Sequence, residues 1–287
     1  MSTPITRRNA LTALGAVVAA TTTAFAESDA VAGVAPAKGR LNQSVCKWCY
    51  NMPLEELTKN AKAMGIQSVE LLTQKEWEIV QKEGLKCAVA MGPSGIGDGW
   101  NRLADHDKLV KESERLLPLV KEANIPNMIV FSGNRRGLAD KDGIVNCAAG
   151  LKRITKLAED LGVTVIMELL NSKHDHKDYQ CDTTAWGVEL CKRVGSPRFK
   201  LLYDIYHMQI MEGDVIDTIQ RNKEFIAHYH TGGVPGRAEI DDSQELNYKT
   251  IARAIADTGF KGYFAHEFIP RNTPMVSLKK AYELCLV

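Results

Sequence analysis

The chain reads V-T-V-I-M-E from Val163 to Glu168, an apolar run without strict polar alternation that ends on a carboxylate. Parallel strands that are covered on both faces have this composition. Seven similar runs recur along the chain, and segments with helical spacing separate them. The eight predicted strands span residues 44–50, 67–72, 86–91, 127–132, 164–170, 199–206, 225–231 and 263–268. This alternation predicts an α/β fold, a single (β/α)8 barrel.

A doubly wound open sheet is the main alternative, because it shares the alternation of strands and helices. That fold predicts a glycine-rich phosphate loop after an early strand, whereas the first predicted strand leads into Asn51-Met52-Pro53. The glycine-rich stretch at 92–99 follows the third strand and fits neither a dinucleotide-binding nor a P-loop pattern. We interpret this stretch as a mobile active-site loop, with a plain connecting loop as the alternative.

The first 26 residues have the features of a twin-arginine export signal. Arg7 and Arg8 precede an uncharged run that ends in Ala24-Phe25-Ala26, a small-x-small cleavage pattern. An amphipathic or disordered tail is the alternative. Residues 27–40 would then be a linker and residues 41–287 the barrel, and the protein would be periplasmic or extracellular.

Composition limits the partners that the chain can have. The chain has 36 Lys and Arg residues and 35 Asp and Glu residues. Its net charge is therefore too small to create a strong electrostatic field that would attract nucleic acid or an anionic membrane. Beyond the signal, no apolar run reaches the ~20 residues that a transmembrane helix needs. We therefore expect a small-molecule substrate, no nucleic acid and no membrane span in the mature chain, while homo-oligomerisation stays open.

The cysteines do not form a disulfide scaffold. There are seven of them, an odd number without dense spacing. Cys46 and Cys49 form a C-x-x-C on the first predicted strand, without the helix N-terminus that lowers a thiol pKa. This placement favours packing over redox chemistry or zinc binding.

Four candidate metal ligands end four consecutive predicted strands: Glu168, Asp204, His230 and Glu267. The strand ends of a barrel meet on one rim, where three carboxylates and an imidazole suit a hard divalent cation. Singly, each residue could be a helix cap, an ion-pair partner or a core histidine. Together they favour a metal, because buried carboxylates without a cation repel one another. His228 lies on the same side of its strand as His230 and is the alternative fourth ligand. We prefer His230 as the ligand because it lies nearer the strand's C-terminal end.

Several segments resemble those of hydroxypyruvate isomerases within the xylose isomerase-like TIM barrel superfamily, which also contains ketose 3-epimerases. These segments are M-E-L-L-N-S at 167–172, D-I-Y-H-M-Q at 204–209, H-x-H at 228–230 followed by P-G-R at 235–237, E-L-N-Y at 245–248 and H-E-F-x-P at 266–270. The resemblance is strongest from about Leu161 to the C-terminus. These motifs are more specific to the superfamily than to any one substrate.

The resemblance implies a role for each matched residue. Glu168 and Glu267 would bind the metal and also carry a proton between adjacent substrate carbons, with Asp204 and His230 as the other two ligands. His207 would contact a substrate oxygen, and Arg237 would face the substrate. The E-L-N-Y residues Glu245, Asn247 and Tyr248 would shape the following loop and helix.

The chain also departs from the family pattern. Hydroxypyruvate isomerases tend to have glutamine where this chain has His230, whereas the epimerases have histidine. Conversely, the epimerases have a further glutamate where this chain has His174. The loop Asn134-Arg135-Arg136-Gly137 matches nothing in the family, and its arginines either bind an anionic substrate or form a solvated basic turn.

The resemblance and the chemistry of the residues together imply an aldose–ketose type isomerase that works through a cis-enediolate. The leading reaction is hydroxypyruvate to tartronate semialdehyde, with one divalent cation that is Mn²⁺ or Mg²⁺, or else Co²⁺ or Zn²⁺. Arg237 would pair with a substrate carboxylate or, alternatively, with Glu239, Asp241 or Asp242. The aromatic residues Trp48, Tyr50 and Trp100 either wall the pocket or pack in the core. Other functions left open are a ketose 3-epimerase, another sugar isomerase, and a non-catalytic exported binder of sugar or metal.

Overall fold

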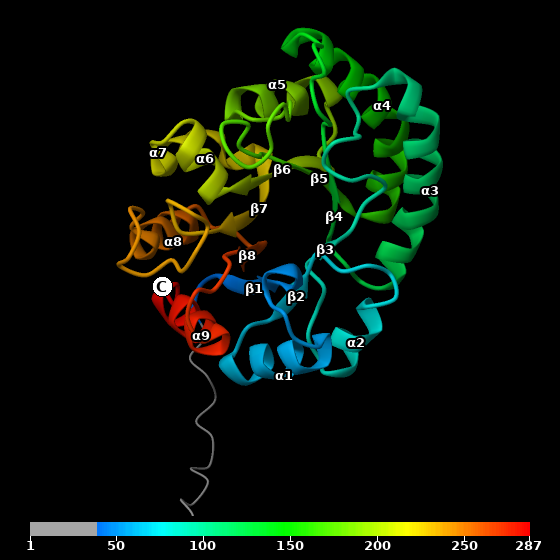
Figure 1. The fold of residues 1–287 in the computed structure, drawn as a ribbon. Coiled ribbons are helices and arrows are strands. Elements are labelled where there is room, and N and C mark those ends of the chain that lie inside the picture. The colour runs from blue at the N-terminus through cyan, green and yellow to red at the C-terminus, as the bar shows by residue number, and fades with distance from the viewer. Residues whose placement is uncertain (1–38) are drawn as a thin grey trace, which may run out of the picture. The chain divides into compact units, whose positions relative to one another are not determined.

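The computed structural model describes residues 39–287 and shows eight parallel strands enclosed by helices (Figure 1). The strands are β1 Asn42–Cys46, β2 Ser68–Glu70, β3 Val89–Ala90, β4 Asn127–Val130, β5 Thr164–Glu168, β6 Phe199–Asp204, β7 Ile226–Thr231 and β8 Tyr263–His266. Parallel bridges from Ser68 to Lys86 and from Leu72 to Ala90 close the barrel between β2 and β3. The predicted single (β/α)8 barrel is confirmed. The predicted signal peptide lies outside the described residues and stays a prediction.

Nine α-helices lie within residues 39–287: α1 Leu54–Met64, α2 Trp77–Lys82, α3 His106–Glu122, α4 Asp140–Leu161, α5 Thr184–Val194, α6 Ile205–Met211, α7 Val215–Asn222, α8 Tyr248–Asp257 and α9 Pro274–Leu284. Gly65 and Gly162 end α1 and α4, and both adopt the left-handed conformation that favours glycine. No helix in this part of the chain combines the length and the hydrophobicity needed to cross a membrane.

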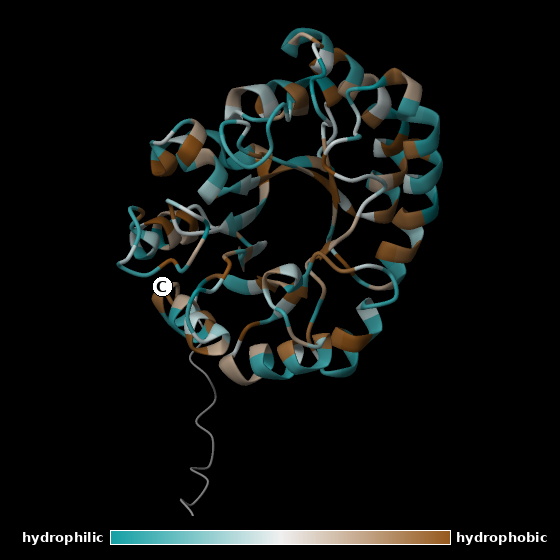
Figure 2. Ribbon diagram, viewed as in Figure 1, coloured by the Kyte–Doolittle hydropathy of each residue, from teal (hydrophilic) through white to brown (hydrophobic). Residues whose placement is uncertain are grey.

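The core lies in the barrel strands and beneath the surrounding helices. Figure 2 shows hydrophobic residues along the strands of the barrel and polar residues on much of the outer helix surface. Every residue of β5 is buried, as expected of a parallel strand that packs both inside and outside the barrel. This burial explains why the V-T-V-I-M run lacks polar alternation.

Several predicted strands extend too far at their C-terminal ends. The first strand stops at Cys46, and Lys47–Cys49 forms a 3₁₀ turn instead of continuing it. The interpretation that Cys46 and Cys49 both lie on a strand is therefore wrong. Both are buried free thiols whose pKa is raised by burial, which agrees with the packing interpretation.

The glycine-rich loop after β3 approaches the neighbouring backbone closely at two positions. A Cβ atom at Gly92 would lie 1.8 Å from the carbonyl oxygen of Ile129, and one at Gly99 would lie 2.2 Å from that of Phe131. Glycine is therefore required at both positions for steric reasons. The loop that these contacts hold in place leads directly to the fully buried Trp100.

The E-L-N-Y motif shapes the loop after β7 and the start of α8, as the resemblance implied. The Asn247 side chain accepts a hydrogen bond from the Thr250 backbone N–H at 3.0 Å and so caps α8. The buried Tyr248 hydroxyl donates to the Gly232 carbonyl oxygen at 2.8 Å and accepts from the Gly232 N–H at 2.9 Å. Tyr248 therefore ties α8 to the chain that leaves β7.

We expect Tyr248→Phe to lower the free energy of unfolding by about 2 kcal/mol, because it leaves a buried N–H and a buried carbonyl unsatisfied. Urea unfolding followed by circular dichroism measures this change. Tyr50→Phe is the matched control, since its buried hydroxyl has no hydrogen-bond partner within residues 39–287. Equal effects of the two substitutions would contradict the bridging role of Tyr248.

Candidate functional site

A cavity of about 770 Å³ opens where the C-terminal ends of the strands meet. Glu168, Glu267 and Arg237 line one part of it. The rest of its wall is largely apolar and includes Leu71, Met91, Ile96, Ile129, Phe131 and Leu170. Catalytic sites of (β/α)8 barrels lie at this end of the barrel, so the cavity is the natural candidate site.

The structure brings all four predicted ligands together beside this cavity. Glu168 and Asp204 are the last residues of β5 and β6, His230 lies in β7, and Glu267 directly follows β8. One donor atom from each residue lies within 4.8 Å of the donor atoms of the other three, and all four residues are buried. Three carboxylates and one imidazole form a donor set that fits a hard or borderline divalent cation.

The four residues are already in contact with one another and with Arg237. His230 Nδ1 lies 2.8 Å from Glu267 Oε2 and 3.2 Å from Glu168 Oε1. Arg237 Nη2 lies 2.5 Å from the same Glu267 oxygen and 3.4 Å from Asp204 Oδ2. The cluster thus joins three acidic side chains to one arginine and one imidazole.

Burial and charge shift the pKa values of the carboxylates in different directions. Burial raises the pKa of Asp204 well above its usual range and also raises that of Glu168. Burial opposes ionisation of Glu267 too, but Arg237 and His230 hold its pKa well below the usual range. The positive charges of Arg237 and His230 therefore compensate the burial of Glu267 but do not fully compensate that of Glu168 and Asp204. Additional positive charge at this cluster would relieve that conflict.

The Arg237 guanidinium lies near two aromatic rings. Its guanidinium carbon lies 5.0 Å from the centre of the Trp48 ring and 5.3 Å from that of Tyr206, within the range of cation–π attraction. Trp48 Nε1 also donates a hydrogen bond to Glu267 Oε1 at 2.7 Å. Trp48 therefore contributes to the wall of the cavity.

The other two aromatic candidates pack elsewhere. Tyr50 and Trp100 are buried, and neither lines the cavity. Trp100 packs beside the His106 ring, and a Cβ atom at Gly150 would lie 2.7 Å from its indole. The core-packing alternative holds for these two residues. From the glycine-rich loop, Gly95 and Ile96 do reach the cavity.

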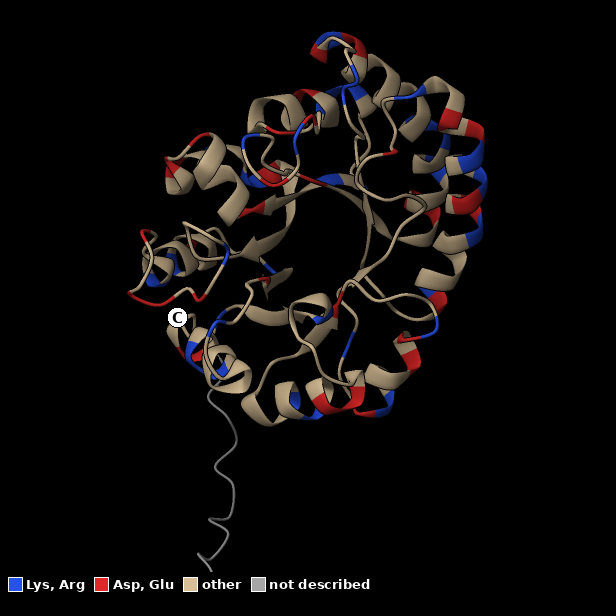
Figure 3. Cartoon of the chain, viewed as in Figure 1, with Lys and Arg blue, Asp and Glu red and all other residues tan. Residues whose placement is uncertain are grey.

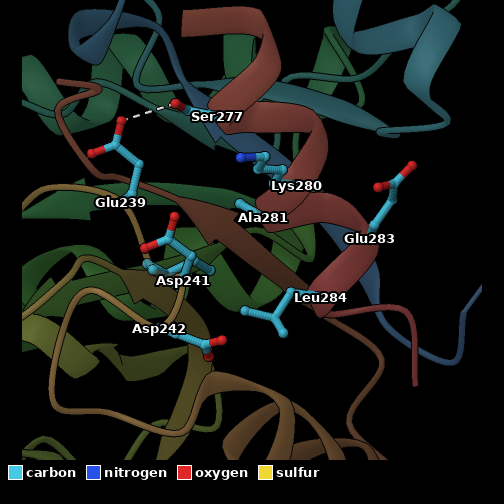
Figure 4. A pocket seen from close by; sticks show the side chains of 9 residues that line it. Glu239, Asp241, Asp242, Ser277, Lys280, Ala281, Glu283 and Leu284 are labelled. Carbon is cyan, nitrogen blue, oxygen red and sulfur yellow. Dashed lines mark hydrogen bonds between the residues drawn. The ribbon is translucent and has the colours of Figure 1, made fainter. Parts of the chain in front are cut away.

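The alternative pairing of Arg237 with Glu239, Asp241 or Asp242 is wrong. A second cavity of about 370 Å³ contains these three acids, which lie across from α9 in Figure 4. Glu239 points toward Ser277 there, and its Oε1 accepts from the Ser277 hydroxyl and the backbone N–H of Arg271, each at 2.9 Å. Glu239 therefore anchors the chain after β8, and this cavity contains none of the candidate ligands.

The hydrogen-bond network around His207 determines which of its ring nitrogens carries hydrogen. Asn171 Oδ1 accepts from the backbone N–H groups of His174 and Asp175, each at 3.0 Å. The Asn171 amide nitrogen must then be the atom that donates to His207 Nδ1, at 2.6 Å. Burial keeps the pKa of His207 well below its usual range, so the neutral ring carries its hydrogen on Nε2.

His207 Nε2 is a buried donor beside Asp204, although His207 does not line the 770 Å³ cavity. It lies 3.6 Å from Asp204 Oδ2 and has no hydrogen-bond partner within the described part of the chain. Buried donors are nearly always satisfied in proteins. Contact of His207 with a substrate oxygen, the role that the resemblance implies, stays a prediction.

Glu70, at the end of β2, contacts the candidate ligand His230 and was not among the residues predicted from the sequence. Its Oε1 lies 2.9 Å from His230 Nε2 and 2.7 Å from His228 Nε2, and all three side chains are fully buried. Although burial opposes ionisation, contacts with His228 and His230 lower the pKa of Glu70 to about 2. In the sequence, the only sign of this contact is that Glu70 is the one charged residue in the predicted strand 67–72. His228 is bound to this carboxylate and lies outside the four-residue cluster.

The unmatched basic loop makes internal ion pairs. Arg135 lies 2.9 Å from Asp140 and 2.9 Å from Asp182, while Arg136 lies 2.6 Å from Asp98. Neither arginine lines the 770 Å³ cavity, so a contact with substrate in that cavity has no support. On the face shown in Figure 3, Lys and Arg residues are interspersed with Asp and Glu over the outer helices.

Comparisons with known proteins agree with the barrel. A 2-oxo-tetronate isomerase of Cupriavidus necator is 37% identical over 110 residues, which cover 38% of this chain and 42% of that protein. This match spans less than half of the relative's length. A "Putative hydroxypyruvate isomerase" of Danio rerio is 28% identical over 234 residues, 81% of each chain.

A solved structure and a family model extend the comparison. The crystal structure of an AP endonuclease, family 2, from Brucella melitensis has a TM-score of 0.73 at 22% identity. The match covers 83% of this chain and 97% of that chain and shows a shared fold alone. The model of the xylose isomerase-like TIM barrel family matches residues 58–284, most of the chain. The protein, with its buried cluster of three carboxylates and a histidine, therefore belongs to the xylose isomerase-like TIM barrel family.

Proposed function

We propose that the protein is a metal-dependent isomerase of a small hydroxycarbonyl compound, acting through a cis-enediolate. The leading reaction is the conversion of hydroxypyruvate to tartronate semialdehyde. The observation that carries the proposal is the close approach of Glu168 and Glu267 in one buried cluster with Asp204 and His230. A binding protein would need the ligands but would not need two carboxylates able to carry protons.

Glu168, Asp204, His230 and Glu267 would hold one divalent ion, with Mn²⁺ or Mg²⁺ favoured over Co²⁺ or Zn²⁺. When bound, such an ion supplies Lewis-acid stabilisation of the charge that develops on the substrate oxygens. The donor set fits this ion because three carboxylates offer hard oxygen atoms and His230 offers one nitrogen.

The residues of the chain supply the proton transfers and the positioning. One of Glu168 and Glu267 removes the proton from the carbon next to the carbonyl, and the same or the other glutamate returns it to the adjacent carbon. His207 Nε2 donates a hydrogen bond to a substrate oxygen. The apolar wall, which includes Phe131 and Leu170, limits the access of water to the intermediate.

Arg237 would recognise the carboxylate of an acid substrate. Arg237 lines the cavity, its side chain is 13% exposed, and its guanidinium lies near the rings of Trp48 and Tyr206. Hydrogen bonds to a charged group in such surroundings contribute about 2 kcal/mol. The planar fork of arginine also suits a carboxylate.

We therefore expect Arg237→Gln to lower kcat/KM for hydroxypyruvate by about 30-fold, the factor that corresponds to about 2 kcal/mol. The same substitution is expected to have a smaller effect on an uncharged ketose. Initial rates on both substrates measure the difference. Arg135→Gln is the matched control, because that arginine lies outside the cavity. Equal losses on the acid and the ketose would contradict carboxylate recognition by Arg237.

A ketose 3-epimerase or other sugar isomerase is the second candidate function. It is favoured by His230, which stands where the epimerases have histidine, and by a cavity of about 770 Å³ that exceeds the needs of a three-carbon acid. Both reactions use the same cluster and the same intermediate. They differ in the substrate that fills the apolar part of the cavity.

Product analysis on the full chain tests the proposal and separates the candidates. The protein is loaded with Mn²⁺ and incubated with hydroxypyruvate or with a panel of ketoses, and the products are identified by chromatography. Tartronate semialdehyde is expected from hydroxypyruvate, whereas an epimerised ketose would favour the second candidate. Failure to convert any of these compounds would leave the binding protein as the better account.

Export through the twin-arginine pathway is a separate proposal that rests on Arg7 and Arg8, and cell fractionation tests it.

A further inference from the structure

A second group of buried polar side chains lies against His230, on the opposite edge of its ring from Glu168 and Glu267. It consists of Cys46 from β1, Glu70 from β2 and His228 from β7, and we name it the Glu70 cluster. All three side chains are fully buried. Neither the resemblance nor the proposed mechanism gives this cluster a role.

One oxygen of Glu70 is the centre of the cluster. Glu70 Oε1 lies 2.7 Å from His228 Nε2, 2.9 Å from His230 Nε2 and 3.9 Å from Cys46 Sγ. The neighbouring strands hold these groups in register, with Cys46 paired to Glu70. The His228 ring also stands edge-on to that of His230, with 5.1 Å between the ring centres. Partners from two other strands, β1 and β7, therefore fix the position of this carboxylate.

The two nitrogens of His230 face different partners. Nδ1 points to Glu267 and Glu168, at 2.8 and 3.2 Å, whereas Nε2 points to Glu70. A neutral imidazole can bind a cation through one nitrogen only if its hydrogen is on the other. Binding through Nδ1 therefore requires hydrogen on Nε2, and Glu70 Oε1 lies where it accepts that hydrogen.

We propose that Glu70 is a positioning residue that sets the tautomer and the ring orientation of His230, so that Nδ1 is presented to the divalent cation. This inference rests on the metal centre of the proposed function. Carboxylates that accept the second N–H of a ligating histidine raise the affinity for the metal, and their loss typically costs about 10- to 100-fold. His228 has the supporting task of holding Glu70 Oε1 in place.

A separate cation site formed by Cys46, Glu70 and His230 is a less favourable assignment. The three side chains do offer donor atoms within 4.8 Å of one another. His230 Nε2, however, cannot donate its hydrogen to Glu70 and also bind a second cation with the same nitrogen. The positioning role uses both nitrogens of His230 and involves no such conflict.

Calorimetric titration of the full chain with Mn²⁺ tests this role, together with thermal unfolding in EDTA. Glu70→Gln is expected to raise the Kd for Mn²⁺ by about 10- to 100-fold, because a neutral amide oxygen accepts the Nε2–H of His230 more weakly than a carboxylate does. A merely structural role predicts a lower Tm in EDTA with unchanged affinity. Glu239→Gln is the matched control, since it alters another buried carboxylate in the 370 Å³ cavity away from the ligands.

The outcomes separate this inference from the proposed function. Equal Mn²⁺ affinity in the wild type and in Glu70→Gln would overturn the role of Glu70 and leave the metal centre intact. Absence of Mn²⁺ binding by the wild type would overturn both. If Glu70→Gln does not fold, Glu70→Asp keeps the charge but shortens the reach to His230. A smaller but measurable loss of affinity is then expected, and unchanged affinity would contradict the proposal.

Discussion

Glu267→Gln is expected to lower kcat by about 10³-fold at saturating Mn²⁺, since general acid–base catalysis contributes roughly 10²- to 10⁴-fold. Glutamine keeps the size of the side chain but cannot accept the substrate proton. Glu267 is also the partner of His230, Arg237 and Trp48, so the substitution alters the most connected carboxylate of the cluster. Initial rates with a Mn²⁺ titration measure the loss separately from any change in metal affinity.

Glu168→Gln should cause a loss of similar size, because the second glutamate belongs to the same proposed proton path. Glu239→Gln is the control for both, being a buried carboxylate that instead anchors the segment after β8. Circular dichroism of each variant shows whether the fold is retained. Survival of wild-type turnover in both Glu168→Gln and Glu267→Gln would refute the enzymatic function and favour a binding protein.

Removal of divalent ions is expected to have the second large effect. After dialysis against EDTA, turnover should fall by about 10³-fold, which corresponds to about 4 kcal/mol of lost stabilisation of the transition state. Added Mn²⁺ or Mg²⁺ should restore it, as measured by initial rates at increasing metal concentration. Far-ultraviolet circular dichroism before and after dialysis separates loss of metal from loss of fold.

Asp204→Asn provides the matched variant for the metal experiment. Asp204 is fully buried, and its Oδ1 also accepts the His207 backbone N–H at 3.1 Å, a bond that the oxygen of asparagine can keep. The variant should therefore fold but need more Mn²⁺ than the wild type to reach half of its activity. Full turnover of the EDTA-treated wild type would contradict a metal-dependent mechanism.

The barrel and the four clustered residues could be predicted because their signals are local. A strand buried on both faces, such as V-T-V-I-M-E, differs in composition from the amphipathic helices around it. A polar residue that ends such a strand lies on the rim of any barrel, so Glu168 and Asp204 could be placed without knowing their neighbours. The strand ends were less predictable, because the apolar pattern at Cys49 continues after the backbone has left the sheet.

The parts of the site that could not be predicted depend on contacts between distant segments. Glu70 lies 160 positions before His230, and its short strand of three residues resembles ordinary core. Arg237 was assigned alternative partners that are near in sequence, whereas closure of the barrel brings it to Asp204 and Glu267. Long-range pairs of this kind follow from the register of the strands, which local composition does not encode.

Proton exchange in D₂O tests the central claim most directly. The Mn²⁺-loaded full chain is incubated with hydroxypyruvate and, separately, with ketoses, and the C–H signals next to the carbonyl are followed by NMR. Our account predicts that the wild type replaces hydrogen with deuterium at this carbon of at least one of these compounds. It also predicts that Glu267→Gln is slower by about 10³-fold. Absence of exchange on every compound, or an equal rate in Glu267→Gln, would contradict the account.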